Sequence, residues 1–168
     1  HGGDAELSWW IGESASLDVL GTIERRVYPD ASVRESSWEG RSDARFEFAP
    51  GDRTTFRLLH ESEIFRYDDP DELDFDSEWA RTAAQLEFHR TTSLDLSLAP
   101  VVAFLRSAVA PNEEYVELGI ELAIDWRFGK NSWLGATNEI GRRDYAVDAA
   151  PDLATDVLSV EVDTDLDA

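Results

Sequence analysis

The chain has 168 residues, 42% of them hydrophobic, and a formal charge of -21, a length that suits one domain with a sizeable core. The acidic charge argues against nucleic acid as a partner, because phosphates would be repelled, and the absence of cysteine excludes disulfides and thiolate metal sites. No apolar run approaches the ~20 residues of a membrane helix. Strands that cross a membrane are not excluded by this observation, because their apolar residues alternate with polar ones.

Alternating stretches bounded by turn residues predict antiparallel strands along the chain, and residues 1–168 are interpreted as one domain. The first stretch, residues 6–11, is short, so residues 1–16 are taken as an additional strand or an extension. Pro100 removes one ladder donor from its strand and predicts a β-bulge there. From residue 17 onward we expect eight longer strands: 17–28, 37–49, 54–67, 79–89, 94–104, 115–128, 133–145 and 157–166.

Residues 116–128 show the pattern most clearly. Apolar side chains fall at every second position from Val116 to Phe128, with Glu, Gly, Ala, Asp and Arg between them. This strict period of two predicts a strand with one apolar face and one charged face. Its length exceeds the roughly five or six residues of an ordinary globular strand.

The turns recur at a regular interval. Short ones fall near residues 14, 52, 91 and 130, and long polar ones near residues 32, 72, 111 and 150, so each series repeats about every 39 residues. The interval equals one long hairpin plus its loop. We therefore expect the short turns at one end of the sheet and the long loops at the other.

Aromatic residues follow the same division. A first set flanks the short turns, a second set lies near the long loops, and Leu, Ile, Val and Ala fill the band between them. Membrane interfaces favour aromatic rings at such positions. The first set is Phe48, Phe56, Phe88, Trp126, Phe128 and Trp133, and the second is Tyr28, Trp38, Phe65, Tyr67, Trp79, Phe104, Tyr115 and Tyr145.

The long alternating strands, the short turns PGD, HRTTS and FGKNS, the long acidic loops and the two aromatic belts resemble the transmembrane β-barrels of Gram-negative outer membranes. The resemblance implies an all-β, antiparallel up-and-down barrel of eight or more strands in the bacterial outer membrane. Its short turns would face the periplasm and its long loops the outside. The implied partners are the lipid bilayer and other envelope proteins or a larger complex, with no nucleic acid and no cofactor.

The resemblance also implies that the charged faces line a lumen. In a narrow barrel these residues would pair and block passage, whereas in a wide one they would line a cation-preferring channel. A pore, an export conduit and a structural envelope subunit therefore stay open as functions. The expected lumen residues are Arg41, Arg45, Arg57, Glu61, Glu63, Arg81, Glu87, Glu117, Glu121, Asp125, Arg127, Glu139 and Arg143.

Two structural alternatives also stay open. Eight strands could close on themselves, whereas a ninth strand and an end without an aromatic residue favour part of a larger barrel. Alternatively, a soluble acidic barrel that binds a ligand would turn the apolar face inward. Small residues between the charges, at Gly119, Ala123, Ala83, Ala99 and Ala103, suit a crowded barrel interior instead.

His60 and Ser62 are the catalytic candidates. They share the parity of Leu58 and are similar to the His-x-Ser on the outer wall of outer-membrane phospholipase A, which would make His60 the base and Ser62 the nucleophile. That family's orienting Asn has no counterpart on the neighbouring strand, where Gln85 should point inward. We therefore expect a non-enzymatic protein, with a lipid hydrolase as the alternative. The acidic loop at residues 68–78 lacks a calcium-loop spacing, so no metal is expected.

Overall fold

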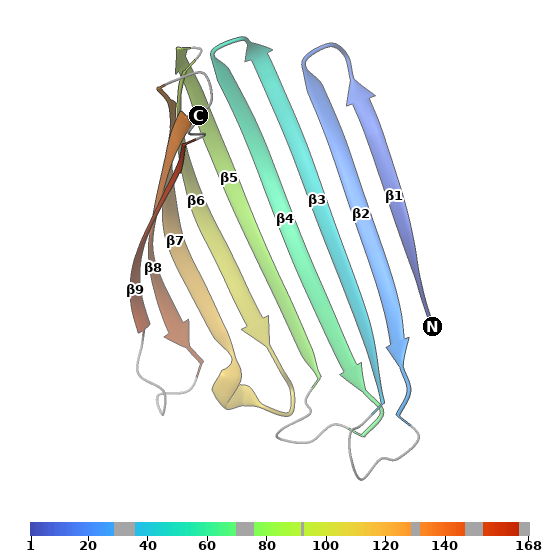
Figure 1. Cartoon of the computed structure of the whole chain (residues 1–168). Helices are drawn as coiled ribbons and strands as arrows, with labels where there is room; N and C mark the ends of the chain where they lie inside the picture. The colour runs from blue at the N-terminus through green and yellow to red at the C-terminus, as the bar shows by residue number, and fades with distance from the viewer. Residues whose placement is uncertain (29–35, 70–75, 92, 129–131, 147–152, 165–168) are drawn as a thin grey trace.

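The computed structural model describes residues 1–28, 36–69, 76–91, 93–128, 132–146 and 153–164. Nine strands form one antiparallel sheet in chain order (Figure 1). A one-turn 3-10 helix, η1 (Pro111–Glu113), lies in the connection after the sixth strand, and no described helix has the length and apolar character needed to span a bilayer. The strands are β1 (Gly2–Ile11), β2 (Ala15–Arg26), β3 (Ser37–Gly51), β4 (Thr54–Tyr67), β5 (Ser77–Thr91), β6 (Leu94–Arg106), β7 (Tyr115–Arg127), β8 (Ser132–Tyr145) and β9 (Leu153–Thr164).

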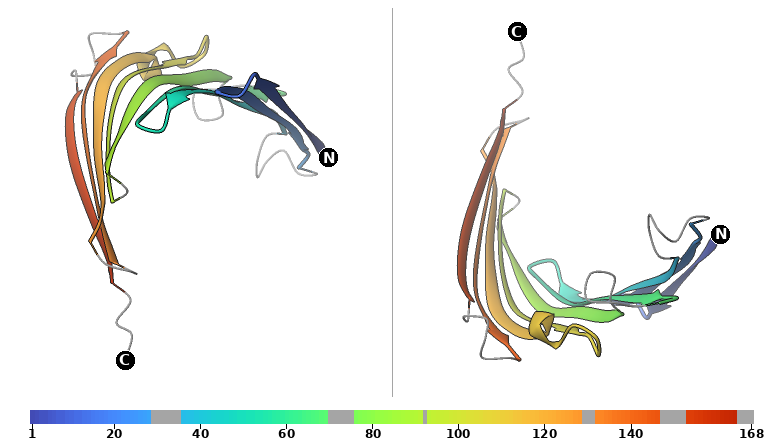
Figure 2. Two further views of the ribbon diagram at one scale, coloured as in Figure 1. Left: turned by 90° about the horizontal axis from the view of Figure 1, so that it is seen from above. Right: turned by 90° about the horizontal axis from the view of Figure 1, so that it is seen from below.

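The all-β, antiparallel, up-and-down arrangement is confirmed, but the described sheet is not closed. Each strand pairs with its neighbours in sequence, and β1 and β9 form the two edges. Seen from either end, the sheet is an open, curved trough (Figure 2). It is therefore a single curved layer, and closure into a barrel is not observed among the described residues.

The N-terminal segment forms a strand, which is one of the two expected alternatives, and this strand is longer than residues 6–11. β1 pairs with β2 over ten residues, from Gly2 opposite Glu24 to Ile11 opposite Ala15. Its first half, GGDA, gives no strand signal, because glycine and aspartate are depleted in strands. Backbone pairing with β2 decides its conformation. β9 likewise begins at Leu153, inside the loop expected from the sequence.

Pro100 does not produce the expected bulge. The pairs Ala83–Val101 and Leu86–Leu98 on either side of it keep one register, and Pro100 itself stands opposite Ile120 of β7. A proline removes one donor, and here the surrounding ladder holds the strand in line without it. The register shifts of β5 and β6 lie beside their short turn, between His89 and Thr91.

The predicted separation of turns is confirmed. The connections β1–β2, β3–β4, β5–β6 and β7–β8 lie at one end of the sheet, the short-turn end, and the others at the opposite, long-loop end (Figure 1). Backbone bonds between neighbouring hairpins extend the ladder at the short-turn end, as from Ala49 N–H to the Ser14 carbonyl at 2.7 Å and from Arg127 N–H to the Ser93 carbonyl at 2.7 Å.

The sheet has little apolar core. Among the described residues its buried hydrophobic side chains are alanines, namely Ala80, Ala83, Ala99 and Ala103, and no large side chain is fully buried. A soluble sandwich buries its large apolar residues between two layers. Here the backbone ladder and cross-strand contacts on the two faces hold the strands together.

Candidate functional surfaces of the sheet

The two faces of the sheet differ in crowding. On one face Glu39, Thr55 and Ala83 are 5%, 6% and 1% exposed, whereas on the other Leu118 is 61% exposed and Leu158 67% exposed. Side chains converge on the concave side of a curved sheet and spread apart on its convex side. The first face, called the charged face, is therefore concave, and the second, called the apolar face, is convex.

All thirteen residues that the sequence analysis expected to line a lumen lie on the charged face. Paired residues of an antiparallel ladder share a face, and the ladder joins Arg41 to Glu63, Glu61 to Arg81 and Glu117 to Arg143. The other expected positions, Arg45, Arg57, Glu87, Glu121, Asp125, Arg127 and Glu139, have the same parity on their strands.

Toward the long-loop end of β2, β3 and β4, the charged face carries alternating charges. Glu39 of β3 lies 2.7 Å from Arg26 of β2 and 2.6 Å from Arg41, which in turn lies 2.7 Å from Glu63 of β4. Both carboxylates thus contact at least one guanidinium group. These ion pairs link β2, β3 and β4 in addition to the backbone hydrogen bonds between the strands.

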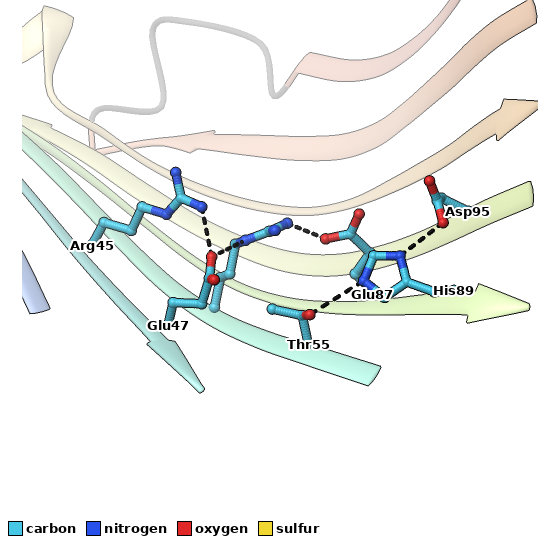
Figure 3. Close-up of polar contacts among 7 residues, drawn as sticks. Arg45, Glu47, Thr55, Glu87, His89 and Asp95 are labelled. Atoms are coloured by element: carbon cyan, nitrogen blue, oxygen red, sulfur yellow. Dashed lines mark hydrogen bonds and ion pairs between the residues drawn. The ribbon is translucent and has the colours of Figure 1, made fainter. Parts of the chain in front are cut away.

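A second group of charges lies toward the short-turn end (Figure 3). Glu47 of β3 accepts hydrogen bonds from Arg45 at 2.6 Å and from Arg57 of β4 at 2.7 Å. Arg57 also donates to Glu87 of β5. The guanidinium of Arg57 therefore bridges two carboxylates across three strands, because it offers several N–H donors that point in different directions.

His89 extends this group to β6. Its Nδ1 lies 2.7 Å from Asp95 Oδ1, and its Nε2 lies 3.2 Å from Thr55 Oγ1 (Figure 3). The order hydroxyl, imidazole, carboxylate is that of a hydrolase triad. Thr55 is only 6% exposed, so its hydroxyl is closed to a substrate. The arrangement stabilises a corner of the sheet.

Glu87, His89 and Asp95 are also the group that could hold a metal ion among the described residues, with ligand atoms within 4.8 Å of one another. Sequence reasoning missed this group. The sequence does contain a signal for it, because His89 and Asp95 lie on either side of a short turn and both have odd numbers. Residues so placed can stand opposite each other in a hairpin, as these two do. Arg57 already neutralises Glu87, which disfavours a cation at this point. Residues 70–75 of the acidic loop lie outside the described residues.

An ion pair crosses an entire strand where small residues lie beneath it. Arg81 of β5 contacts Glu121 of β7, passing over β6 at Ala103 and Ala99, which pair with them in the ladder. Both alanines are buried. A larger side chain at either position would occupy the path of the ion pair, so the small residues permit the contact.

Near the long-loop end of β7 and β8, Arg143 combines two contacts. Its Nη2 lies 2.6 Å from Glu117 Oε2, and its guanidinium lies 4.0 Å from the centre of the Tyr115 ring. Tyr115 also meets Tyr145 edge to face at 6.0 Å. The ion pair and the cation–π contact together hold the Arg143 side chain against the charged face of the sheet.

The apolar face carries aromatic residues near the short-turn end of β1, β3, β5 and β7. These aromatic residues do not stand directly opposite one another across the sheet. From each of these strands to the next, two strands away, the aromatic residue lies two positions closer to the short turn than the residue directly opposite. A stagger of one residue per strand corresponds to a strand tilt of about 36°, as in a closed barrel in which eight strands have a shear number of eight. Trp9 shares a row with Phe46, two residues before Phe48; Phe48 with Leu86, two before Phe88; and Phe88 with Ile124, two before Trp126.

Formal charges on the apolar face are confined to the ends of the described strands. Arg90 lies at the short-turn end, and the others lie toward the long loops. Between them the face carries Leu, Ile, Val, Phe and Ala with a few uncharged polar residues. The charged positions toward the long loops are Arg25, Arg66, Glu78, Arg106, Arg142, Asp144 and Asp156.

The register divides the expected aromatic sets. Phe48, Phe56, Phe88 and Trp126 lie on the apolar face, and Phe128 packs on Trp126 with ring centres 5.3 Å apart. Trp133 instead pairs with Arg127 and lies on the charged face, because the strand parity restarts after the turn. Of the second set, Trp38 and Phe104 lie on the apolar face, and Phe65, Tyr67, Trp79, Tyr115 and Tyr145 lie on the charged face.

His60 and Ser62 lie on the apolar face but bond to other strands. His60 Nδ1 lies 2.9 Å from Thr82 Oγ1 of β5, and Ser62 Oγ lies 2.8 Å from Ser42 Oγ of β3. Among the described residues no hydrogen bond joins His60 to Ser62, and no carboxylate or amide orients the imidazole. The described hydrogen bonds of His60 and Ser62 therefore run to neighbouring strands and not to each other.

Comparisons with protein-family models, curated proteins and solved structures find no match for the chain.

Proposed function

We propose that the sheet forms part of the wall of an outer-membrane β-barrel, with the apolar face against lipid and the charged face toward a water-filled lumen. The observation that carries this proposal is the charge-free band of the apolar face, bounded by the staggered aromatics. A stagger of one residue per strand is what a level belt around a tilted barrel requires. An aqueous protein has no reason to keep so large a convex surface free of charge.

The height of the band supports the same function. Trp38 and Phe48 lie ten residues apart on β3. At ~3.3 Å per residue and a tilt of ~36°, they span about 27 Å along the barrel axis. This is close to the apolar band of ~25 Å in transmembrane barrels. Trp38 and Phe104 would then mark the second interface, as part of a girdle.

The charged face supports a lumen. Ion pairs such as Arg57–Glu87 and Arg81–Glu121 lie on the side where a barrel encloses water, and acids outnumber arginines on this face. Such a lining favours cations. The protein would serve as a pore, an export conduit or a structural subunit of an envelope complex, and none of its residues is assigned a catalytic role.

Flotation tests the membrane part of this proposal. The chain, refolded from denaturant in the presence of phosphatidylcholine vesicles, should float with them and should aggregate when vesicles and detergent are absent. A monodisperse chain in plain buffer that stays out of the vesicle fraction would favour a soluble acidic barrel.

Conductance separates the candidate roles. In planar bilayers, a pore or conduit predicts cation-selective current steps, and Glu121→Gln together with Glu117→Gln should lower that selectivity. Silent bilayers from chains that float, and whose β1 and β9 amides are protected from exchange and so paired into a closed wall, would leave the structural subunit as the function.

A further inference from the structure

The two edges of the sheet define what can complete the wall. In lipid, an unpaired backbone N–H or C=O group costs several kcal/mol, so β1 and β9 must each pair with another strand. This step rests on the proposed barrel function. The described strands alternate in direction, and there are nine of them. β1 and β9 therefore run the same way, from the long-loop end to the short-turn end (Figure 1).

The shared direction limits the occupant. A strand antiparallel to β1 and a strand antiparallel to β9 also run the same way, so an odd number of strands must connect the two edges in an all-antiparallel barrel. A second copy of the nine-stranded sheet, oriented the same way in the membrane, would place its β9 parallel to β1. Parallel pairs are less stable per residue than antiparallel ones.

Charge gives an independent argument. β1 and β9 contain no arginine or lysine, and their charged-face positions include Asp4, Glu6 and Glu161. The one-residue stagger of the aromatic residues, extended to β9, places Thr164 at the same level along the barrel axis as Trp9. Glu6 lies three residues before Trp9, and Glu161 lies three residues before Thr164, so the two glutamates are also at one level. A second copy would therefore set Glu6 beside Glu161, and like charges on adjoining strands repel.

We propose that the wall is completed by a partner sheet with an odd number of antiparallel strands, whose lumen-facing side chains beside β1 and β9 are basic. These would pair with Asp4, Glu6 and Glu161, as the arginines of β3, β4, β5 and β8 pair with acids inside the sheet. The partner differs from a second copy of this chain in both strand direction and charge.

Synthetic strand peptides test this partner chemistry. Two eleven-residue peptides share alternating Leu and Val on one face and differ on the other, where one has Arg and one has Glu. Each carries a cysteine near its amino end. Because the chain has no cysteine, single substitutions report the register: Ile11→Cys and Gly3→Cys on β1, and Val160→Cys and Ala154→Cys on β9. All four lie on the apolar face, and a side chain at Gly3 meets open space.

In vesicles, with copper phenanthroline and oxygen as the oxidant, the Arg peptide should form disulfides with Ile11→Cys and Val160→Cys at least tenfold faster than the Glu peptide, and tenfold faster than with Gly3→Cys or Ala154→Cys. Equal rates for the two peptides would overturn the charge assignment, and preference for Gly3→Cys would overturn the direction. A disulfide between separate chains carrying Ala5→Cys and Val160→Cys, which the stagger places at one level, would identify a second copy as the occupant.

Flotation of the same samples separates the two proposals. Chains that float but do not couple to the Arg peptide contradict the partner sheet alone. Chains that couple with the predicted register but stay out of the vesicle fraction contradict the membrane function alone. Amide exchange in β4, β5 and β6, which lie away from the edges, shows that each cysteine variant is folded.

Discussion

At the scale of single residues, hydrogen bonds decide between functional and structural roles. His60 and Ser62 point the same way from β4, yet each is engaged by a neighbouring strand, through Thr82 and Ser42. A hydroxyl is activated by a base within hydrogen-bond reach and an orienting group behind that base. Within the described part of the chain neither is bonded to Ser62, whose hydroxyl bonds to Ser42 and so links β4 to β3 across the apolar face.

Ser62→Ala tests that role. The variant should leave phospholipid hydrolysis at the wild-type level, which we expect to equal the vesicle blank, because Ser62 lacks a base. A release of fatty acid by the wild type that disappears in Ser62→Ala would establish the lipid hydrolase. His60→Gln is the matched variant, since it removes the imidazole and keeps a polar side chain.

At the long-loop end, Arg25 and Asp68 make a two-point contact, with Nη1 to Oδ1 at 2.9 Å and Nη2 to Oδ2 at 2.5 Å. The hydrogen bonds from Arg25 lower the pKa of the Asp68 carboxyl below its ordinary value. A lowered pKa in the folded state contributes stability above the ordinary aspartate pKa, and this contribution is lost as pH falls through the lowered value.

The contact between β2 and the loop after β4 should therefore persist as acid is added past the point where a free aspartate titrates. In Arg25→Gln the carboxyl of Asp68 should titrate at the ordinary aspartate value. Carbon-detected NMR of the Asp68 carboxyl measures both curves. Coincident titration of Asp68 in the wild type and in Arg25→Gln would contradict the contact.

At the scale of strands, the charged face couples strands that are not adjacent. Arg81 on β5 reaches Glu121 on β7 because Ala99 and Ala103 leave a low path over β6. Both charged side chains are partly exposed, so solvent screens the pair, and a coupling energy of ~0.2–1 kcal/mol is expected.

A double-mutant cycle with Arg81→Gln and Glu121→Gln measures that coupling. The two single variants should each destabilise the sheet, and the double variant should be less destabilised than their sum by ~0.2–1 kcal/mol, as followed by urea unfolding in vesicles. Strict additivity would show that the ion pair does not connect β5 to β7. Glu139→Gln, on the same face, is the control for loss of a single charge.

The alternation of residues predicts most of the strands and both faces, since period two and turn chemistry act locally. The extent of β1 could not be predicted, because Gly2 and Gly3 give no strand signal and only pairing with β2 orders them. The face of Trp133 depends on the number of residues in the preceding turn. The contact of Thr55, His89 and Asp95 joins three strands, and no local pattern encodes it.

At the scale of the whole molecule, the convex surface is apolar and the concave surface is charged, which is the reverse of a soluble barrel. A charge in the middle of the apolar band should therefore destabilise the membrane-bound protein, whereas the same charge near the rim of the band should be tolerated. Leu122 and Val116 are a matched pair for this test, because both lie on the apolar face of β7 and both are exposed.

Leu122→Arg should destabilise the vesicle-bound protein by ~2–4 kcal/mol, and Val116→Arg by ~0–1 kcal/mol, as expected for the midplane and the interface of a bilayer. Urea titration in vesicles compares them. Equal effects of the two substitutions would mean that the band does not follow membrane depth.

The central claim, that the apolar face meets lipid and the charged face meets water, is tested most directly on β7. Single cysteines at residues 118 to 125, each carrying a spin label, report access to oxygen, which concentrates in lipid, and to a water-soluble nickel chelate. In vesicles, Leu118, Ile120, Leu122 and Ile124 should be accessible to oxygen, and the positions between them to the nickel chelate, with a period of two. Loss of that period, or its inversion, would contradict the account.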